Sequence, residues 1–257
     1  MPGIRHQKPN VKVVANADSV ARECVNIFID AAKKAVKTKG VFYTAISGGN
    51  TPIKFFSLLG SQAEAKNLPW DKTQVFWVDE RYVPHNSPHS NYKLACDTFL
   101  SKVPIPKENI HPIQTEDEDS DSARKKYEEA IRSVFNIKLG QLPEFDLVIL
   151  GMGADGHTGS MFPCSYASFD TSDIACAVYL MDEKNLPDKP ITRITLTHPV
   201  LCAASRIVML VTGDEKAQIL KEVLSSPPDD VCYPVHTLWP ALEKITWLID
   251  AAAAKFL

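Results

Sequence analysis

The stretch FDLVILGMGADGHTGSMFP, residues 145–163, decides the fold. It begins with a nearly unbroken apolar run, Leu147 to Leu150, which is typical of a parallel strand buried on both faces. Glycines at 151, 153 and 156 end the run, and Asp155 and His157 stand beside them. Because glycine lets the backbone turn sharply and approach a ligand closely, the stretch predicts a ligand site. Open α/β sheets place such sites at the carboxyl ends of their strands.

Three interpretations of this loop compete. Its glycines fit G-x-G-x-x-G, the pattern of dinucleotide folds, but Asp155 would place negative charge beside a pyrophosphate. Pro163 also limits any following helix to about two turns. The second interpretation is a tight turn in which His157 makes an incidental hydrogen bond. In the third, His157 is a general base or acid held by a carboxylate, which requires a further functional element elsewhere in the chain.

Apolar segments alternate with helical patterns along all 257 residues. Strands are expected at 11–15, 41–46, 75–78, 175–180, 192–197, 206–211 and 245–249. Helices are expected after Asp18 or Ser19, after the turn at 47–52, and at 91–100, 122–135 and 216–224. No repeat and no compositional linker divides the sequence. We therefore expect one α/β domain over residues 1–257, a doubly wound, mostly parallel sheet with helices on both faces.

The overall composition excludes several classes of partner. With 28 basic and 31 acidic residues, the net charge of −3 argues against nucleic acid or an anionic membrane. No apolar run approaches the roughly 18 residues of a membrane span, and the first ten residues lack an apolar signal segment. A cytoplasmic protein is the expectation. Six cysteines without a C-x-x-C pair favour reduced thiols over disulfides or zinc.

A second glycine-rich turn, Ser47-Gly48-Gly49-Asn50-Thr51-Pro52, follows the strand expected at 41–46. Asn50 or Thr51 can cap the next helix, and Pro52 suits its first position. The N–H groups around glycines, together with a helix dipole, form a cradle for an anion such as a phosphate monoester. The absence of a Walker A pattern removes the main support for nucleotide triphosphate hydrolysis. A plain turn between strand and helix is the alternative.

Charged residues follow further strands. Asp79-Glu80-Arg81-Tyr82-Val83-Pro84 is expected to form another loop at a strand's carboxyl end, where the guanidinium of Arg81 suits a phosphate or carboxylate. A surface ion-pair cluster is the alternative. Arg193 lies in an alternating strand and can face solvent or the cleft. Lys216 lies near a helix N-terminus, where an unfavourable dipole indicates a bound anion.

Taken together, SGGNTP (47–52), DERYVP (79–84) and LGMGADGHTGSMFP (150–163) resemble the 6-phosphogluconolactonase family in residues, order and spacing. The likeness extends to ITRITLT (191–197), TGDEK (212–216) and WLIDAAAA (247–254), although the family often has Ala in place of Gly159 and Leu in place of Met161. The resemblance implies hydrolysis of 6-phospho-D-glucono-1,5-lactone to 6-phosphogluconate in the oxidative pentose phosphate pathway. It further implies that neither a metal nor an organic cofactor is used. Separately, we expect a monomer or weak dimer.

The resemblance also implies the site residues. His157 is the expected base, with Asp155 beside it. The expected substrate-binding residues are Ser47, Gly48, Gly49, Asn50, Thr51, Asp79, Arg81, Gly153, Arg193 and Lys216. Among them, the Ser-Gly-Gly turn and Arg81 are expected to hold the phosphate. Arg193 and Lys216 match further basic positions of the family.

The expected mechanism needs no covalent nucleophile, because a lactone is an activated ester. His157 would remove a proton from a water molecule that attacks C1, and Asp155 or a carboxylate of the 79–80 pair would orient the imidazole. N–H groups of residues 151–156 are candidate donors to the oxyanion. Ser47 as a nucleophile is disfavoured, because G-x-S-x-G is absent. A polar loop at 184–190 is a candidate for closure over the substrate.

Two other functions stay open. Glucosamine-6-phosphate deaminases resemble this chain in the Ser-Gly-Gly turn and in Asp-Gly-His, but they lack the arginine of DERYVP. They also carry an F-N-E-P element, whose glutamate is missing here, where Met161-Phe162-Pro163 follows Ser160. A non-catalytic sugar-phosphate-binding protein would keep the 47–51 turn and would not need His157. The lactonase hypothesis requires His157 and the 47–51 turn to converge on one pocket.

Overall fold

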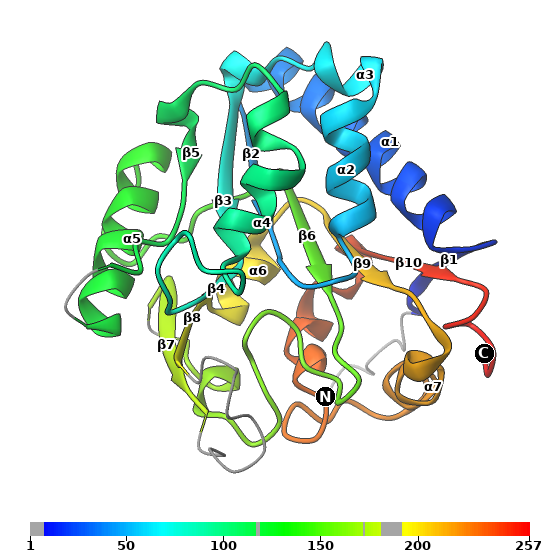
Figure 1. The fold of residues 1–257 in the computed structure, drawn as a ribbon. Helices are drawn as coiled ribbons and strands as arrows, with labels where there is room; N and C mark the ends of the chain where they lie inside the picture. The colour runs from blue at the N-terminus through cyan, green and yellow to red at the C-terminus, as the bar shows by residue number, and fades with distance from the viewer. Residues whose placement is uncertain (1–7, 117–118, 172, 181–191) are drawn as a thin grey trace.

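The main sheet of the computed structural model contains seven strands among the residues that the structure describes, which are 8–116, 119–171, 173–180 and 192–257 (Figure 1). All its neighbouring strands are parallel, in the order β1-β10-β9-β6-β2-β3-β5. The strands are β1 (Asn10–Val14), β2 (Phe42–Ile46), β3 (Thr73–Trp77), β5 (Ile110–His111), β6 (Leu147–Gly151), β9 (Ile207–Val211) and β10 (Ile245–Asp250).

Strands β6 and β9 form the buried centre of the sheet. All five residues of β9 are buried, as are Leu147 to Leu150 of β6. Because successive side chains of a strand point to opposite faces, both faces must be covered. Helices surround the sheet (Figure 1). The expected doubly wound, mostly parallel architecture is confirmed.

The chain changes direction across the sheet between β2 and β6. From β2 the order proceeds outward through β3 to β5, whereas from β6 it proceeds the opposite way through β9 to β10. Neighbouring strands whose connections leave in opposite directions open a crevice at their carboxyl ends. This point of the fold therefore brings together the turns that follow β2 and β6.

A second, antiparallel sheet of three strands was not predicted. It contains β4 (Asp79–Arg81), β8 (Thr192–Leu196) and β7 (Ala175–Tyr179). The prediction of a loop at Asp79-Glu80-Arg81 was wrong, because the chain passes from one sheet to the other at Val78. The Val78 N–H donates to Ile46 O at 2.9 Å, whereas its carbonyl accepts from Leu196 N at 2.7 Å.

The helices are α1 (Ala17–Lys39), α2 (Ile53–Ser61), α3 (Ala63–Lys66), α4 (Asn91–Thr98), α5 (Ser120–Phe135), α6 (His198–Ala203) and α7 (Ala217–Ser225), together with short 3-10 turns and the longer 3-10 segment η6 (Pro234–Lys244). Within the described ranges, none is long and apolar enough to cross a membrane. Neither α6 nor η6 was predicted. The loop expected at 184–190 lies outside the described residues.

Two predicted helix caps are wrong by a few residues. Helix α1 is capped by Asn16, whose side chain accepts from Ser19 N at 3.0 Å, and not by Asp18 or Ser19. The N-cap position of α2 is Pro52, which makes no side-chain cap. Asn50 is therefore not the N-cap of α2. Its carbonyl instead closes a turn, because it accepts a hydrogen bond from Ile53 N at 3.3 Å.

Candidate active site

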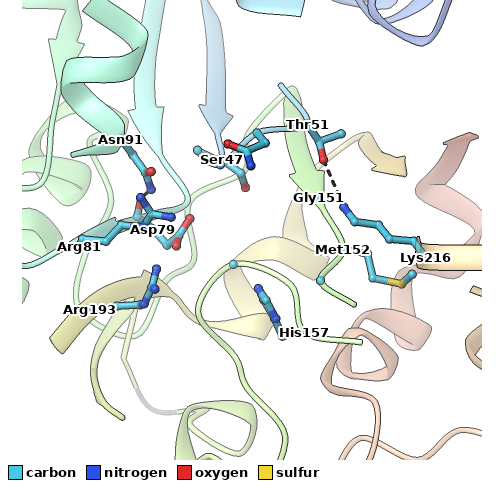
Figure 2. Close-up of a pocket in the computed structure, with 15 residues that line it drawn as sticks. Ser47, Thr51, Asp79, Arg81, Asn91, Gly151, Met152, His157, Arg193 and Lys216 are labelled. Carbon is cyan, nitrogen blue, oxygen red and sulfur yellow. Dashed lines mark hydrogen bonds between the residues drawn. The ribbon is translucent and has the colours of Figure 1, made fainter. Parts of the chain in front are cut away.

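A cleft opens at the carboxyl ends of β2, β6 and β9, with β4 and β8 on one side (Figure 2). Every site residue predicted from the sequence lines it except Asp155. The required convergence of His157 with the 47–51 turn is therefore found in the structure. The lining residues are Ser47, Gly48, Gly49, Asn50, Thr51, Asp79, Arg81, Asn91, Gly151, Met152, Gly153, His157, Gly159, Arg193 and Lys216.

The carboxylate that holds His157 is Asp155. Its Oδ1 lies 2.5 Å from His157 Nδ1 and also accepts the backbone N–H of His157 at 3.1 Å. An ionised carboxylate only accepts hydrogen bonds, so Nδ1 carries the proton and the lone pair of the neutral ring lies on Nε2. Burial raises the pKa of Asp155, but the hydrogen bond and charge of His157 outweigh it and lower that pKa overall. The imidazole can thus accept a proton at Nε2.

Gly153 makes room for this pair. A Cβ at Gly153 would lie 2.2 Å from His157 Nδ1 and 2.6 Å from Asp155 Oδ1. The Gly153 N–H donates to His157 O at 2.8 Å, and the Gly156 N–H donates to Gly153 O at 3.2 Å. These two N–H groups close the turn, so they are not free to bind an oxyanion, and the predicted set of donors at 151–156 is smaller than expected.

The turn after β2 is held to the sheet at Ser47. The backbone N–H groups of the three residues that follow are left without an acceptor in the protein. Ser47 N donates to Ile149 O at 3.0 Å, which joins the turn to β6. Within the described part of the chain, the N–H groups of Gly48, Gly49 and Asn50 make no hydrogen bond to the protein. The Ser47 hydroxyl is buried and has no partner among these residues either. A serine without a neighbouring base is not an activated nucleophile, whereas free amides before α2 suit an anion.

Asn91, at the start of α4, is a pocket residue that the sequence did not reveal. Its Nδ2 donates to Asp79 O at 2.8 Å. Its side chain lies so close to Gly48 that a Cβ on this glycine would be 1.8 Å from Asn91 Oδ1. The contact joins segments that are far apart in the chain, and no local pattern signals it.

Asp79 and Glu80 have structural partners and do not contact the imidazole. Glu80 is 1% exposed, and its carboxylate accepts from the amides of Arg81, Asn91 and Tyr92, each at 2.7 Å, and from the Ser90 hydroxyl at 3.0 Å. Burial raises the pKa of Glu80, and these hydrogen bonds oppose the change. Asp79 Oδ2 accepts from Ser160 Oγ at 2.7 Å. Glu80 therefore ties β4 to the start of α4.

Arg81 and Arg193 form one basic wall of the cleft. They are direct partners in the antiparallel pairing of β4 with β8, so Arg193 faces the cleft and not the solvent. One Arg81 Nη donates to His89 O at 2.7 Å. Burial lowers the pKa of Arg193; the charge of Arg81 acts in the same direction and that of Asp79 opposes it. Two adjacent guanidinium groups repel each other and favour an anion between them.

Lys216 lies at the other side of the cleft, with His157 between it and the arginines in the view of Figure 2. Its Nζ donates to Thr51 Oγ1 at 3.2 Å. Burial lowers the pKa of Lys216, while Glu215 and Asp250 act in the opposite direction. The site therefore combines an oriented imidazole with cationic groups on two sides. Among the described residues, no group of three or more His, Cys, Asp or Glu side chains is arranged to hold a metal ion.

Comparisons with known proteins agree over nearly the whole chain. The family described as glucosamine-6-phosphate isomerases/6-phosphogluconolactonase matches residues 15–247. The 6-phosphogluconolactonase of Nostoc sp. (strain PCC 7120) is 36% identical over 246 residues, covering 96% of this chain and 97% of the relative. That of Synechocystis sp. (strain PCC 6803) is 35% identical over 247 residues, covering 96% and 98%. The crystal structure of 6-phosphogluconolactonase from Thermotoga maritima has a TM-score of 0.78 at 28% identity, covering 95% of this chain and 100% of that one.

Proposed function

Because the chain belongs to the glucosamine-6-phosphate isomerase/6-phosphogluconolactonase family, we propose that it is a 6-phosphogluconolactonase, a single-domain enzyme that hydrolyses 6-phospho-D-glucono-1,5-lactone to 6-phosphogluconate. The observation that carries the proposal is the Asp155–His157 pair, held at 2.5 Å within a cleft that has cationic groups on two sides. A neutral base beside anion-binding groups matches an electrophilic ring that carries a phosphate.

In the proposed reaction, Nε2 of His157 removes a proton from a water molecule while the oxygen of that water attacks C1 of the lactone. The carbonyl oxygen becomes an oxyanion, while Asp155 stabilises the imidazolium through Nδ1. The imidazolium then returns the proton to the ring oxygen as the C1–O bond breaks. The product is the open-chain acid, and the base is restored. General base catalysis of this kind contributes about 10²- to 10⁴-fold to a rate.

The phosphate is proposed to bind at the turn after β2. The free N–H groups of Gly48, Gly49 and Asn50 precede α2, whose dipole adds partial positive charge. Arg81, Arg193 and Lys216 supply the formal positive charge that a dianion requires. Binding the phosphate away from C1 would fix the lactone relative to His157, which raises the effective concentration of the reacting groups.

A coupled assay at about pH 6.5, where spontaneous opening of the lactone is slower, tests the proposal. The 6-phosphorylated and unphosphorylated lactones are compared side by side. We expect enzymatic turnover of the phosphorylated lactone and a much lower kcat/KM for the other. Turnover no faster than the spontaneous reaction would overturn the proposal.

An ammonia-release assay on glucosamine 6-phosphate tests the deaminase alternative, and the lactone assay tests the binding-protein alternative. A deaminase would convert glucosamine 6-phosphate and release ammonia, which we do not expect from a chain without the glutamate of F-N-E-P. A binding protein would take up 6-phosphogluconate and leave the rate of lactone opening unchanged. It would also have no need for the hydrogen-bonded imidazole at Asp155.

A further inference from the structure

The ring of Phe162 lies next to two groups of the site. Its centroid is 4.5 Å from that of the His157 imidazole, with 41° between the ring planes. The guanidinium carbon of Arg193 lies 5.4 Å from the same centroid. Phe162 does not line the cleft, so it touches these groups without being placed to touch the substrate.

The position of Phe162 is set by a short turn that both sheets hold. The turn closes where Met161 N donates to Thr158 O at 3.1 Å. At one end, Thr158 Oγ1 donates to Gly151 O at 2.9 Å, which joins the turn to the end of β6. At its centre, Ser160 Oγ donates to Asp79 Oδ2 at 2.7 Å, which joins it to β4. The aromatic ring is therefore placed by the same strands that carry the cleft.

Phe162 restrains the His157 imidazole and the Arg193 guanidinium where their own hydrogen bonds do not. The side chain of His157 is bonded to Asp155 through Nδ1. A single hydrogen bond of this kind does not stop the imidazole from rotating about it. A neighbouring aromatic ring limits that rotation, and thereby fixes where Nε2 points. Arg193 Nε is buried and has no hydrogen-bond partner among the described residues. The negative face of an aromatic ring attracts such a cation.

We propose that Phe162 is a positioning residue that sets the imidazole of His157 and the guanidinium of Arg193 relative to each other through its aromatic face. The inference rests on the proposed function, because it gives these two groups a common substrate. An aromatic ring is required, since an aliphatic side chain fills similar space but lacks the quadrupole that attracts Arg193 and the imidazolium formed during the reaction.

The test compares Phe162→Tyr, which keeps the ring, with Phe162→Leu, which keeps apolar bulk without it. Phe169→Leu is the control, because Phe169 is an aromatic residue 53% exposed outside the cleft. Thermal unfolding verifies that each variant is folded. We expect Phe162→Tyr and the control to stay within about twofold of wild-type kcat/KM, and Phe162→Leu to lose about tenfold through both a lower kcat and a higher KM. Equal kinetics for the Tyr and Leu variants would overturn the inference.

A second measurement does not depend on lactone turnover. The Nδ1 proton of His157, bonded to Asp155, gives a downfield proton resonance when the imidazole is held. We expect this resonance in the wild type and in Phe162→Tyr, and its loss or broadening in Phe162→Leu. A resonance unchanged in Phe162→Leu would overturn the inference even if the enzyme turned over no lactone. An inactive wild type with the expected resonances would contradict the proposed function alone.

Discussion

Arg81 and Arg193 lie directly opposite each other in the pairing of β4 with β8, and both guanidinium groups line the cleft. Like charges directly across an antiparallel pair are destabilising. The Nε atoms of both side chains are buried without a partner within the described residues. The repulsion between the two guanidinium groups destabilises the free protein. A bound anion that offsets this repulsion would explain why the two arginines lie together.

Replacing Arg81 with Ala is therefore expected to raise KM for the phosphorylated lactone about tenfold and to change kcat little, because one charge-assisted contact to the substrate is lost. Steady-state kinetics measure both constants. Arg22→Ala is the matched control, since Arg22 lies on α1 and outside the cleft. An unchanged KM would remove Arg81 from the substrate site.

Replacing His157 with Asn should lower kcat by about 10²-fold or more, since the proposed base is lost. Asp155→Asn should cost less, because the base remains but its tautomer and orientation are no longer fixed by a carboxylate. Single-turnover rates on folded protein provide the comparison. Wild-type turnover by the His157 variant would refute the mechanism.

Gly48→Ala tests the contact with Asn91. The new methyl would lie 1.8 Å from Asn91 Oδ1, and Asn91 is fixed by its bond to Asp79 O. We expect a loss of about 1 to 3 kcal/mol in the free energy of unfolding and a higher KM. Asn91→Ala in the same chain should relieve the clash, so the double variant should be more stable than the sum of the single effects predicts. Simple additivity in urea unfolding would show that the two positions do not interact.

The pKa of Lys216 gives a pH dependence of binding. Because burial lowers this pKa, the ammonium loses its proton at a lower pH than an exposed lysine does. The affinity for 6-phosphogluconate should therefore fall as pH rises, and the fall should begin at a lower pH than the titration of an exposed lysine, whose pKa is about 10.4. Lys216→Arg should remove this dependence, since arginine stays charged there. Calorimetric titration of the product provides the test, and parallel curves for the two proteins would contradict the prediction.

A second pH effect concerns stability at the edge of the main sheet. Burial lowers the pKa of His111 to about 4, and its ring stacks on Phe76 at 4.4 Å. The unfolded chain, with an ordinary pKa near 6.5, then binds a proton that the folded protein does not, so stability is lost as pH falls from about 6.5 toward 4. The loss corresponds to roughly 2 kcal/mol, allowing for partial exposure. Urea unfolding of His111→Gln should lack this part of the pH dependence, and identical profiles would contradict the assignment.

The elements found from the sequence are those with strong local patterns. Leu147 to Leu150 identified β6, and the glycine-rich turns predicted a ligand edge, because the carboxyl ends of parallel strands share one side of a sheet. Arg193 could not be oriented, since strand alternation allows either face. Its pairing with Arg81 decides the direction.

What was missed depends on contacts between distant segments. Strand β4 has only three residues, all of them charged, and exists through its pairing with β8. Asn91 enters the cleft because Gly48 has no side chain, a fit that neither residue indicates alone. The cap of α1 was misplaced for a local reason, since Asn16, Asp18 and Ser19 are all good capping residues and only the backbone geometry selects Asn16.

Because the chain passes from the parallel to the antiparallel sheet at Val78, the two sheets carry different parts of the candidate site. The parallel sheet carries the imidazole and the glycine-rich turn, whereas the short antiparallel sheet carries the paired arginines. Exchanging residues on β4 and β8 changes the charge and width of one wall while the strand register beneath His157 stays the same. If the proposed function holds, selectivity for differently charged lactones can therefore diverge among related enzymes, or be redesigned, without changing the proposed base His157 or its partner Asp155.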